Sequence, residues 1–290
     1  MRSFELIEPR SLGEACVALA AVEDVKVIAG GTALLPMIKQ RLMLPRLLVN
    51  LKKLRDASEI SFDSQGGVRI GALATINEIE TSPLLRKLYP VLAEACHVVA
   101  NIRIRNMATL GGNLAHGDYQ SDPPTVLSAL DARVELRSQR GTRTLSLGDF
   151  QLGSYETALA PGELVSAVLI PPPPDGLKGL YMKFTSGSSE ERPCAGIAAF
   201  IRTENGICRE LRLAVGAVSA QPVRINSAEE RARNQPLTTE LMQAIADESA
   251  RVVRPIDDIR GPADYKRHLV GVLAGRALTA LAVGESEIHT

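Results

Sequence analysis

Two pairs of adjacent glycines offer the clearest chemistry in this sequence. The first pair lies in Val27-Ile-Ala-Gly-Gly-Thr-Ala-Leu34, and the second in Thr109-Leu-Gly-Gly-Asn113, where a hydroxyl and an amide flank the glycines. Glycine lacks a Cβ, can adopt a positive φ and lets the backbone approach a ligand closely. Successive N–H groups in such a turn can hold an anion. Each turn alone is also consistent with a tight structural turn, but together they predict one ligand with two phosphates, held between two parts of the fold.

The first glycine pair stands between a predicted strand and a predicted helix. Val25–Ala29 is a short apolar run that predicts a buried strand, and Ala33–Leu42 predicts a helix that Thr32 can cap. A strand, glycines and a helix N-terminus together favour phosphate, because the first-turn amides lack partners and the helix dipole is positive there. A helix opening at Ser11 and a second strand at 47–50 complete a small α/β unit.

The rest of the chain predicts two further units. Between about residues 57 and 175 we expect an antiparallel unit, with strands at 59–62, 68–71, 132–137, 143–145 and 165–170. We also expect a helix opened by a capping box at 75–78, a helical segment at 84–100 with a helix start at Pro90, and a helix at 125–130. Pro171-Pro-Pro-Pro174 is a stiff segment that predicts a domain boundary. Beyond it we expect a three-stranded meander and then helices, at 179–184, 196–202, 208–216, 227–233, 238–253 and 262–283. The alternation of Arg and Leu at 209–213 predicts a sheet with one wet face.

Composition is that of an ordinary globular protein and excludes several classes. A length of 290 residues suggests about two domains, and Lys+Arg 33 balances Asp+Glu 33, so no net charge attracts nucleic acid or an anionic membrane. Trp is absent, which disfavours a base-stacking platform. The N-terminus lacks the apolar core of a signal peptide, and no apolar run approaches the ~18 residues of a membrane span. We therefore expect a cytoplasmic protein with no nucleic-acid partner and no membrane span.

No residue set predicts catalysis or metal binding. The four cysteines lie far apart without a C-x-x-C pair, and the four histidines show no metal-ligand spacing. The sequence also offers no acid–base pair and no nucleophile constellation. The predicted site is therefore a binding site, with no catalytic residue and no metal.

Four segments, taken in order, resemble a known family. They are Ala29-Gly-Gly-Thr-Ala-Leu-Leu-Pro36, Ile104-Arg-Asn-Met-Ala-Thr-Leu-Gly-Gly-Asn113 with Asp122, Pro161-Gly-Glu-Leu-Val165, and Arg260-Gly-Pro-Ala-Asp-Tyr-Lys-Arg267. Together they resemble the FAD-binding medium subunit of molybdenum hydroxylases, of the carbon monoxide dehydrogenase and xanthine dehydrogenase type. The resemblance covers essentially the whole chain.

The resemblance implies an α+β fold class with FAD as cofactor. It implies an FAD-binding domain at 1–175, made of a small α/β subdomain (about 1–56) and an antiparallel-sheet subdomain (57–175), followed at 176–290 by a three-stranded sheet with a helical bundle. It places FAD between the first two parts, with Asp122 at its sugar or ribityl region and Val165 and Lys183 near the ring end. The implied cofactor-binding residues are Ala29, Gly30, Gly31, Thr32, Ala33, Leu34, Ala100, Thr109, Leu110, Gly111, Gly112, Asn113, Asp122, Val165 and Lys183.

This chain departs from its relatives in three places. Ala108 and Leu110 replace two residues of the second motif, which is usually Gly-Thr-Ile-Gly-Gly-Asn. The loop 185–194 leads to the flavin region in relatives, some of which place an aromatic residue there, and this loop has none. No cysteine lies between Cys96 and Cys194, so the cysteine-rich insert of one branch of the family is absent.

By resemblance, the chain passes electrons from iron–sulfur clusters through FAD to an external acceptor. The implied partners are a large subunit with the molybdenum cofactor and a small two-iron two-sulfur subunit, in a dimer of heterotrimers. Two alternatives remain. One is a stand-alone FAD-dependent oxidoreductase of the same superfamily, which would need its own substrate site. The other is an assembly module that has lost the cofactor. A Rossmann dehydrogenase is disfavoured because no G-x-G triplet occurs.

Overall fold

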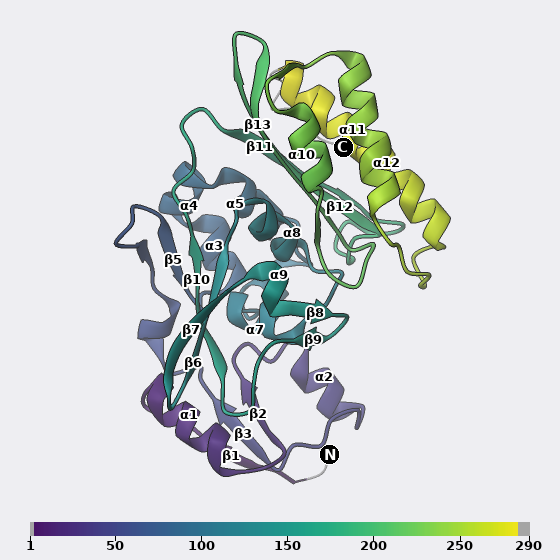
Figure 1. Ribbon diagram of the computed structural model, residues 1–290. Helices are drawn as coiled ribbons and strands as arrows, with labels where there is room; N and C mark the ends of the chain where they lie inside the picture. Colours follow the sequence, from purple (N-terminus) through teal and green to yellow (C-terminus); the bar gives the residue numbers. More distant parts are fainter. Residues whose placement is uncertain (1–2, 284–290) are drawn as a thin grey trace.

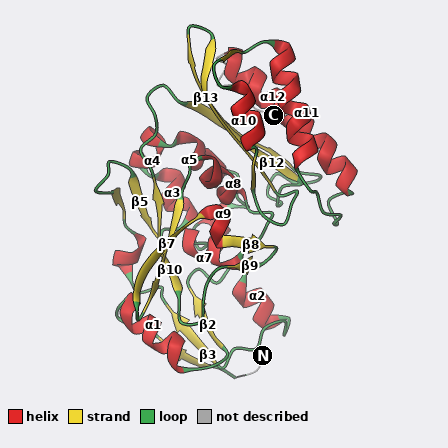
Figure 2. Ribbon diagram, viewed as in Figure 1, coloured by secondary structure: helices red, strands yellow, loops and turns green. Residues whose placement is uncertain are grey.

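The computed structural model describes residues 3–283 and shows three units along one long axis (Figure 1). The N-terminal unit lies at one end, the C-terminal helices lie at the other, and a helix-rich unit stands between them (Figure 2). Each unit is built on its own sheet. None of the helices described is long and apolar enough to cross a membrane.

The N-terminal unit is a three-stranded parallel sheet in the order β1-β3-β2. A 3-10 helix, η1 (Arg55–Ser58), leads from it into the middle unit. The predicted helix at 33–42 is shorter in the structure, and the three-residue β1 was not predicted because it is too short to show a period. The elements are β1 (Glu5–Ile7), α1 (Leu12–Ala21), β2 (Val25–Ile28), α2 (Leu34–Lys39) and β3 (Leu47–Asn50).

The middle unit is a five-stranded antiparallel sheet in the order β4-β5-β10-β6-β7. Its helices form the largest apolar core with the sheet. The strands are β4 (Ile60–Phe62), β5 (Val68–Gly71), β6 (Arg133–Ser138), β7 (Gly141–Ser146) and β10 (Leu164–Ile170), with the small pair β8 (Gln151–Gly153) and β9 (Glu156–Thr157). The helices are α3 (Ile76–Thr81), α4 (Pro83–Leu88), α5 (Pro90–His97), α6 (Ile102–Arg105), α7 (Leu110–His116), α8 (Asp122–Ala129) and α9 (Leu147–Phe150).

One local expectation in this unit is confirmed and another changes. A helix begins at Pro90 as predicted, and the helical segment at 84–100 is two helices because Pro90 has no N–H to continue the ladder of α4. The second glycine pair does not form a positive-φ turn: Gly111 and Gly112 lie in the first turn of α7, whose N-cap is Thr109. Of the four glycines in the two pairs, Gly31 is the one with a positive φ, at 72°.

The C-terminal unit is an antiparallel sheet in the order β11-β12-β13-β14, with β15 also paired to β13. The three long strands confirm the predicted meander. Helices α11 and α12 cover one face of this sheet and form a second apolar core with it. The elements are β11 (Lys178–Phe184), β12 (Ala195–Glu204), β13 (Ile207–Gly216), β14 (Val223–Arg224), α10 (Asn226–Ala232), β15 (Gln235–Pro236), α11 (Thr239–Val252) and α12 (Ala263–Val283).

The predicted alternation holds at 209–213, where Leu211 and Leu213 are buried and Arg209 and Arg212 are partly exposed, but the prediction of one wet face is wrong farther along the sheet. Ala198, Phe200 and Ala214 belong to the core of the middle unit. Helix α8 packs so closely on β13 that a Cβ at Gly216 would lie 1.9 Å from Thr125 Oγ1. The covering helix comes from a distant part of the chain, so local alternation could not reveal it. The C-terminal sheet is therefore buried on both faces where α8 packs on it, around Ala198–Phe200 and Ala214–Gly216.

Candidate functional site

The first glycine turn carries backbone amides without protein partners. The N–H groups of Gly30 through Leu34 find no acceptor among residues 3–283. Helix α2 has Ala33 as its N-cap, with no side-chain capping bond. The prediction that Thr32 caps this helix is therefore wrong, and its hydroxyl is left for another partner. A run of unengaged N–H groups at a helix start is suited to an anion.

The second glycine turn uses its amides differently. Leu110 and Gly111 donate to the carbonyls of Ala74 and Ala72, at 2.9 and 2.8 Å. The Gly112 amide donates to the capping Thr109 Oγ1 at 3.1 Å. The expectation that this turn offers successive free amides is therefore wrong.

The glycine at position 111 is needed for backbone packing. A Cβ at Gly111 would lie 2.6 Å from the Ala72 Cβ, so only glycine lets α7 approach this segment. Position 112 faces outward and is exposed. The second pair therefore ties α7 to the chain that follows β5, and the contact of its residues with FAD stays a prediction.

The two turns meet each other directly. A Cβ at Gly30 would lie 1.8 Å from the carbonyl oxygen of Met107, so the absence of a side chain lets the turns touch. They line one hollow of about 380 Å³, within the range of small-molecule pockets. Its lining residues are Ala29, Gly30, Lys52, Leu54, Ser58, Leu73, Thr75, Glu78, Asn106, Met107 and Thr109. The central prediction, that both glycine turns border one site, agrees with this geometry.

Asp122 and Lys183 lie apart from this hollow, in a buried network that joins the middle and C-terminal units. Lys183 Nζ donates to Asp122 Oδ2 at 3.2 Å and to the Val98 carbonyl at 2.7 Å. The Tyr181 hydroxyl donates to Asp122 Oδ1 at 2.8 Å. Both carboxylate oxygens of Asp122 therefore have protein partners, and its contact with FAD stays a prediction.

Burial dominates the electrostatics of this network. It raises the pKa of Asp122 to about 6, although Lys183 and the Tyr181 hydroxyl oppose the shift. Burial, with the nearby Asp122 charge, also raises the pKa of Tyr181 well above its usual range. Tyr181 and Lys183 are two residues apart on β11 and so share one face of the strand. That spacing was the sequence signal that could have paired Tyr181 with the predicted Lys183.

The remaining predicted residues, Ala100, Asn113 and Val165, all lie in the middle unit. Ala100 follows α5 and has a φ of 43°. Asn113 accepts a hydrogen bond from the Ser121 hydroxyl at 2.9 Å, which connects the turn to the start of α8. Val165 is buried in the middle core, at a register shift between β10 and β6.

The loop at 185–194 contacts the start of α6 and the segment before α8. Asn101 donates to Glu190 at 3.1 Å, and Arg192 pairs with Asp118 at 2.5 Å. Asp118 is buried, whereas the Arg192 side chain is half exposed. These two contacts fix a loop that carries no aromatic residue.

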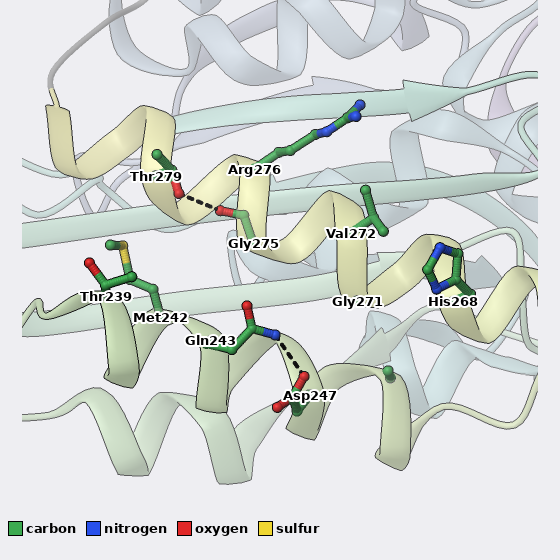
Figure 3. Close-up of a pocket in the computed structure, with 11 residues that line it drawn as sticks. Thr239, Met242, Gln243, Asp247, His268, Gly271, Val272, Gly275, Arg276 and Thr279 are labelled. Atoms are coloured by element: carbon green, nitrogen blue, oxygen red, sulfur yellow. Dashed lines mark hydrogen bonds between the residues drawn. The ribbon is translucent and has the colours of Figure 1, made fainter.

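A second hollow, of about 530 Å³, lies between α11 and α12 (Figure 3). Its hydrogen bonds, from Gln243 to Asp247 and from Thr279 to the Gly275 carbonyl, each join residues four apart on one helix. The Arg276 side chain extends away from Gln243 and Asp247. The polar groups that line this hollow therefore do not converge on a ligand. Within the described chain, no three His, Cys, Asp or Glu side chains are grouped to hold a metal.

Comparison with known proteins places these features in a family. Residues 2–173 match the family described as the FAD binding domain in molybdopterin dehydrogenase. Residues 183–281 match the carbon monoxide dehydrogenase flavoprotein C-terminal domain. The chain is 32% identical over 278 residues to the carbon monoxide dehydrogenase medium chain of Hydrogenophaga pseudoflava, covering 96% of both chains. It is 35% identical over 270 residues to the nicotine 6-hydroxylase medium subunit of Paenarthrobacter nicotinovorans, covering 93% of this chain and 94% of that one.

Solved structures agree. Carbon monoxide dehydrogenase from Hydrogenophaga pseudoflava matches with a TM-score of 0.92 and 33% identity, over 96% of this chain and 97% of that chain. Quinoline 2-oxidoreductase from Pseudomonas putida 86 matches with a TM-score of 0.93 and 30% identity, over 99% of both. Fold and matches together define an FAD-binding oxidoreductase subunit. More particularly, the chain belongs to the FAD-binding medium subunits of the molybdenum hydroxylases.

Proposed function

We propose that this chain is the electron-transfer subunit of a multi-subunit molybdenum hydroxylase. We propose that it holds FAD between its N-terminal and middle units. The observation that carries the proposal is the run of unengaged amides at Gly30–Leu34, beside a hollow that both glycine turns line. A diphosphate needs such donors, because its oxygens are acceptors only. Bound FAD would supply reversible uptake and release of electrons, while the protein binds and orients it.

The roles of the chain's own residues follow from their chemistry. The amides of Gly30–Leu34 and the Thr32 hydroxyl would donate to the diphosphate, and Lys52 on the rim of the hollow would offset its charge. Thr109 and its neighbours hold the opposite wall in place through the bonds of α7 to Ala72 and Ala74. Asp122, Val165 and Lys183 are proposed for the sugar and ring portions.

The proposed partners are a large subunit with the molybdenum cofactor and a small two-iron two-sulfur subunit. The names of several relatives, such as medium chain and medium subunit, support this assembly. We propose a dimer of heterotrimers, in which electrons from the small subunit reach FAD here and leave to an external acceptor.

Titration of the purified chain tests the cofactor proposal. FAD added to the apoprotein should give quenched flavin fluorescence and a perturbed visible spectrum. FMN, which lacks the diphosphate bridge and the second nucleotide, should bind at least about tenfold more weakly, because the amide run is proposed to hold the bridge. Equal affinity for the two flavins contradicts the diphosphate assignment, and absence of FAD binding contradicts the proposal.

Purification of the native complex through a tag on this chain tests the subunit role. The complex should contain flavin, iron and molybdenum together. Flavin without iron and molybdenum, with turnover by the isolated chain, would favour a stand-alone flavoenzyme. A complex without flavin would favour an assembly module.

A further inference from the structure

The segment between α5 and α6 contains a strained residue that the surrounding structure must hold in place. Ala100 has a φ of 43°, in the left-handed region. This conformation disfavours a residue with a Cβ by roughly tenfold and persists only where neighbouring groups impose it. The carbonyl groups of Val98, Val99 and Ala100 show which neighbours do so.

Each of these three carbonyls accepts a hydrogen bond from a buried cation. Lys183 Nζ donates to Val98 O at 2.7 Å. Arg105 Nη1 donates to Val99 O at 3.2 Å and to Ala100 O at 3.3 Å. The backbone N–H groups of Ala100 and Asn101, by contrast, find no acceptor in the part of the chain that the structure describes.

Arg105 is itself fixed by Glu80. Its Nε donates to Glu80 Oε2 at 2.7 Å, and both side chains are 11% exposed. Glu80 also meets His97 Nδ1 at 2.8 Å through its other oxygen. Burial alone would raise the pKa of Glu80, but these hydrogen bonds and the Arg105 charge together lower it, so the carboxylate stays ionised. One planar guanidinium thus serves the carboxylate with Nε and the two carbonyls with Nη1, a geometry that a lysine ammonium cannot reproduce.

We propose that Arg105, oriented by Glu80, is a positioning residue for the flavin. It holds the Val98–Asn101 segment in the strained conformation in which Ala100 meets the cofactor. This inference rests on the proposed function, because Ala100 is proposed to contact FAD. Neither Ala100 nor Arg105 lines the hollow at the first glycine turn. This clamp, in which Arg105 and Glu80 hold the Val98–Asn101 segment, therefore acts on a part of the cofactor other than the diphosphate.

The test compares FAD with ADP, which carries the same diphosphate and adenosine but no flavin. Arg105→Lys should weaken FAD binding about tenfold, the factor that corresponds to the strain at Ala100, and should change the shape of the visible flavin band. ADP affinity should change less than about twofold, because its diphosphate is held at the first turn. Arg103→Lys is the matched control, because Arg103 lies on the same short helix with its side chain exposed. It should leave both affinities unchanged.

A rescue variant separates positioning from general stability. Ala100→Gly in the Arg105→Lys background removes the Cβ strain and should recover most of the FAD affinity. Equal losses of FAD and ADP binding without rescue would show a structural role only and overturn the proposal. Unchanged FAD affinity and spectrum in Arg105→Lys would also overturn it. Failure of the unmutated chain to bind FAD is a different result, because it overturns the proposed function and removes the basis of the clamp.

Discussion

In the first glycine turn the amides of Gly30 through Leu34 lack acceptors among the described residues, whereas in the second turn Leu110 through Gly112 all donate to protein oxygens. The two turns have nearly the same sequence chemistry, yet one keeps its donors available and the other uses them to fasten a helix. The difference arises from what lies behind each turn. Behind the second turn are the carbonyls of Ala72 and Ala74, and α2 presents no such carbonyls to the first. Adjacent glycines thus show that backbones come close, but not whether the partner is a ligand or the protein itself.

The largest effect should come from the position where the two turns touch. Gly30→Ala places a Cβ 1.8 Å from the Met107 carbonyl oxygen, so the turns must separate. We expect FAD affinity to fall by about 100-fold or more, because the hollow changes shape and the amide run is displaced. Isothermal titration with FAD measures this. Gly13→Ala in α1 is the control, because the nearest atom to its new Cβ is Ser11 Oγ at 3.6 Å. Equal affinities in the two variants would contradict the two-turn site.

The second turn offers a matched pair that separates packing from binding. Gly111→Ala places a Cβ 2.6 Å from the Ala72 Cβ and 2.8 Å from its carbonyl oxygen, both inside the core. We expect a loss of about 1–3 kcal/mol in the free energy of unfolding, as for other overpacked cores. At exposed Gly112 the new Cβ meets only Thr109 Oγ1, at 2.9 Å. The gain in helix propensity offsets that contact, so Gly112→Ala should stay within about 0.5 kcal/mol.

Chemical denaturation of the apoprotein measures both changes. If Gly112→Ala lowers stability as much as Gly111→Ala, the second turn does not act as a packing tie in the way described. If Gly111→Ala keeps full stability but no longer binds FAD, the second turn binds the cofactor, as the first turn is proposed to do, and is not mainly a packing contact.

The last effect appears only as the pH changes and concerns Asp122, which the second turn reaches through Asn113 and Ser121. Its pKa is raised to about 6, so the folded chain holds this proton more tightly than the unfolded chain. The resulting stabilisation is fully present below about pH 4 and is lost as the pH rises through about 6. Relative to Asp122→Asn, the free energy of unfolding should fall by roughly 1–3 kcal/mol between pH 4 and pH 7. Urea denaturation across this range checks the sign, and a difference that grows with pH would contradict the assigned shift.

Much of the fold follows from local sequence patterns. The strand–glycine–helix order of the first turn, the polyproline segment and the three-strand meander all have periods or turn residues that act over a few positions. The two glycine turns alone predicted one ligand with two phosphates, and the resemblance added that this ligand is FAD. The domain limits at 56 and 175 stay predictions.

The rest depends on contacts between distant residues. Nothing near Gly111 indicates that Ala72 will lie against it, and nothing near Arg209–Leu213 indicates that α8 will cover the sheet. Glu80 and Arg105 are 25 positions apart, and their pairing is set by how α3 and α6 pack. Charged residues at such spacings have no periodic signal, so the clamp on Ala100 appears only in three dimensions.

The burial of the C-terminal sheet between α8 and its own helices has a practical consequence for dissecting this chain. If the chain were cut at Pro171–Pro174, the C-terminal fragment would expose the apolar face formed by Ala198, Phe200 and Ala214 to water. The N-terminal fragment would expose the apolar residues of α8 that this face covers. Both fragments should aggregate through this exposed apolar surface. The two family domains therefore share one apolar core. Exchanging the C-terminal domain between relatives would require matching changes in α8.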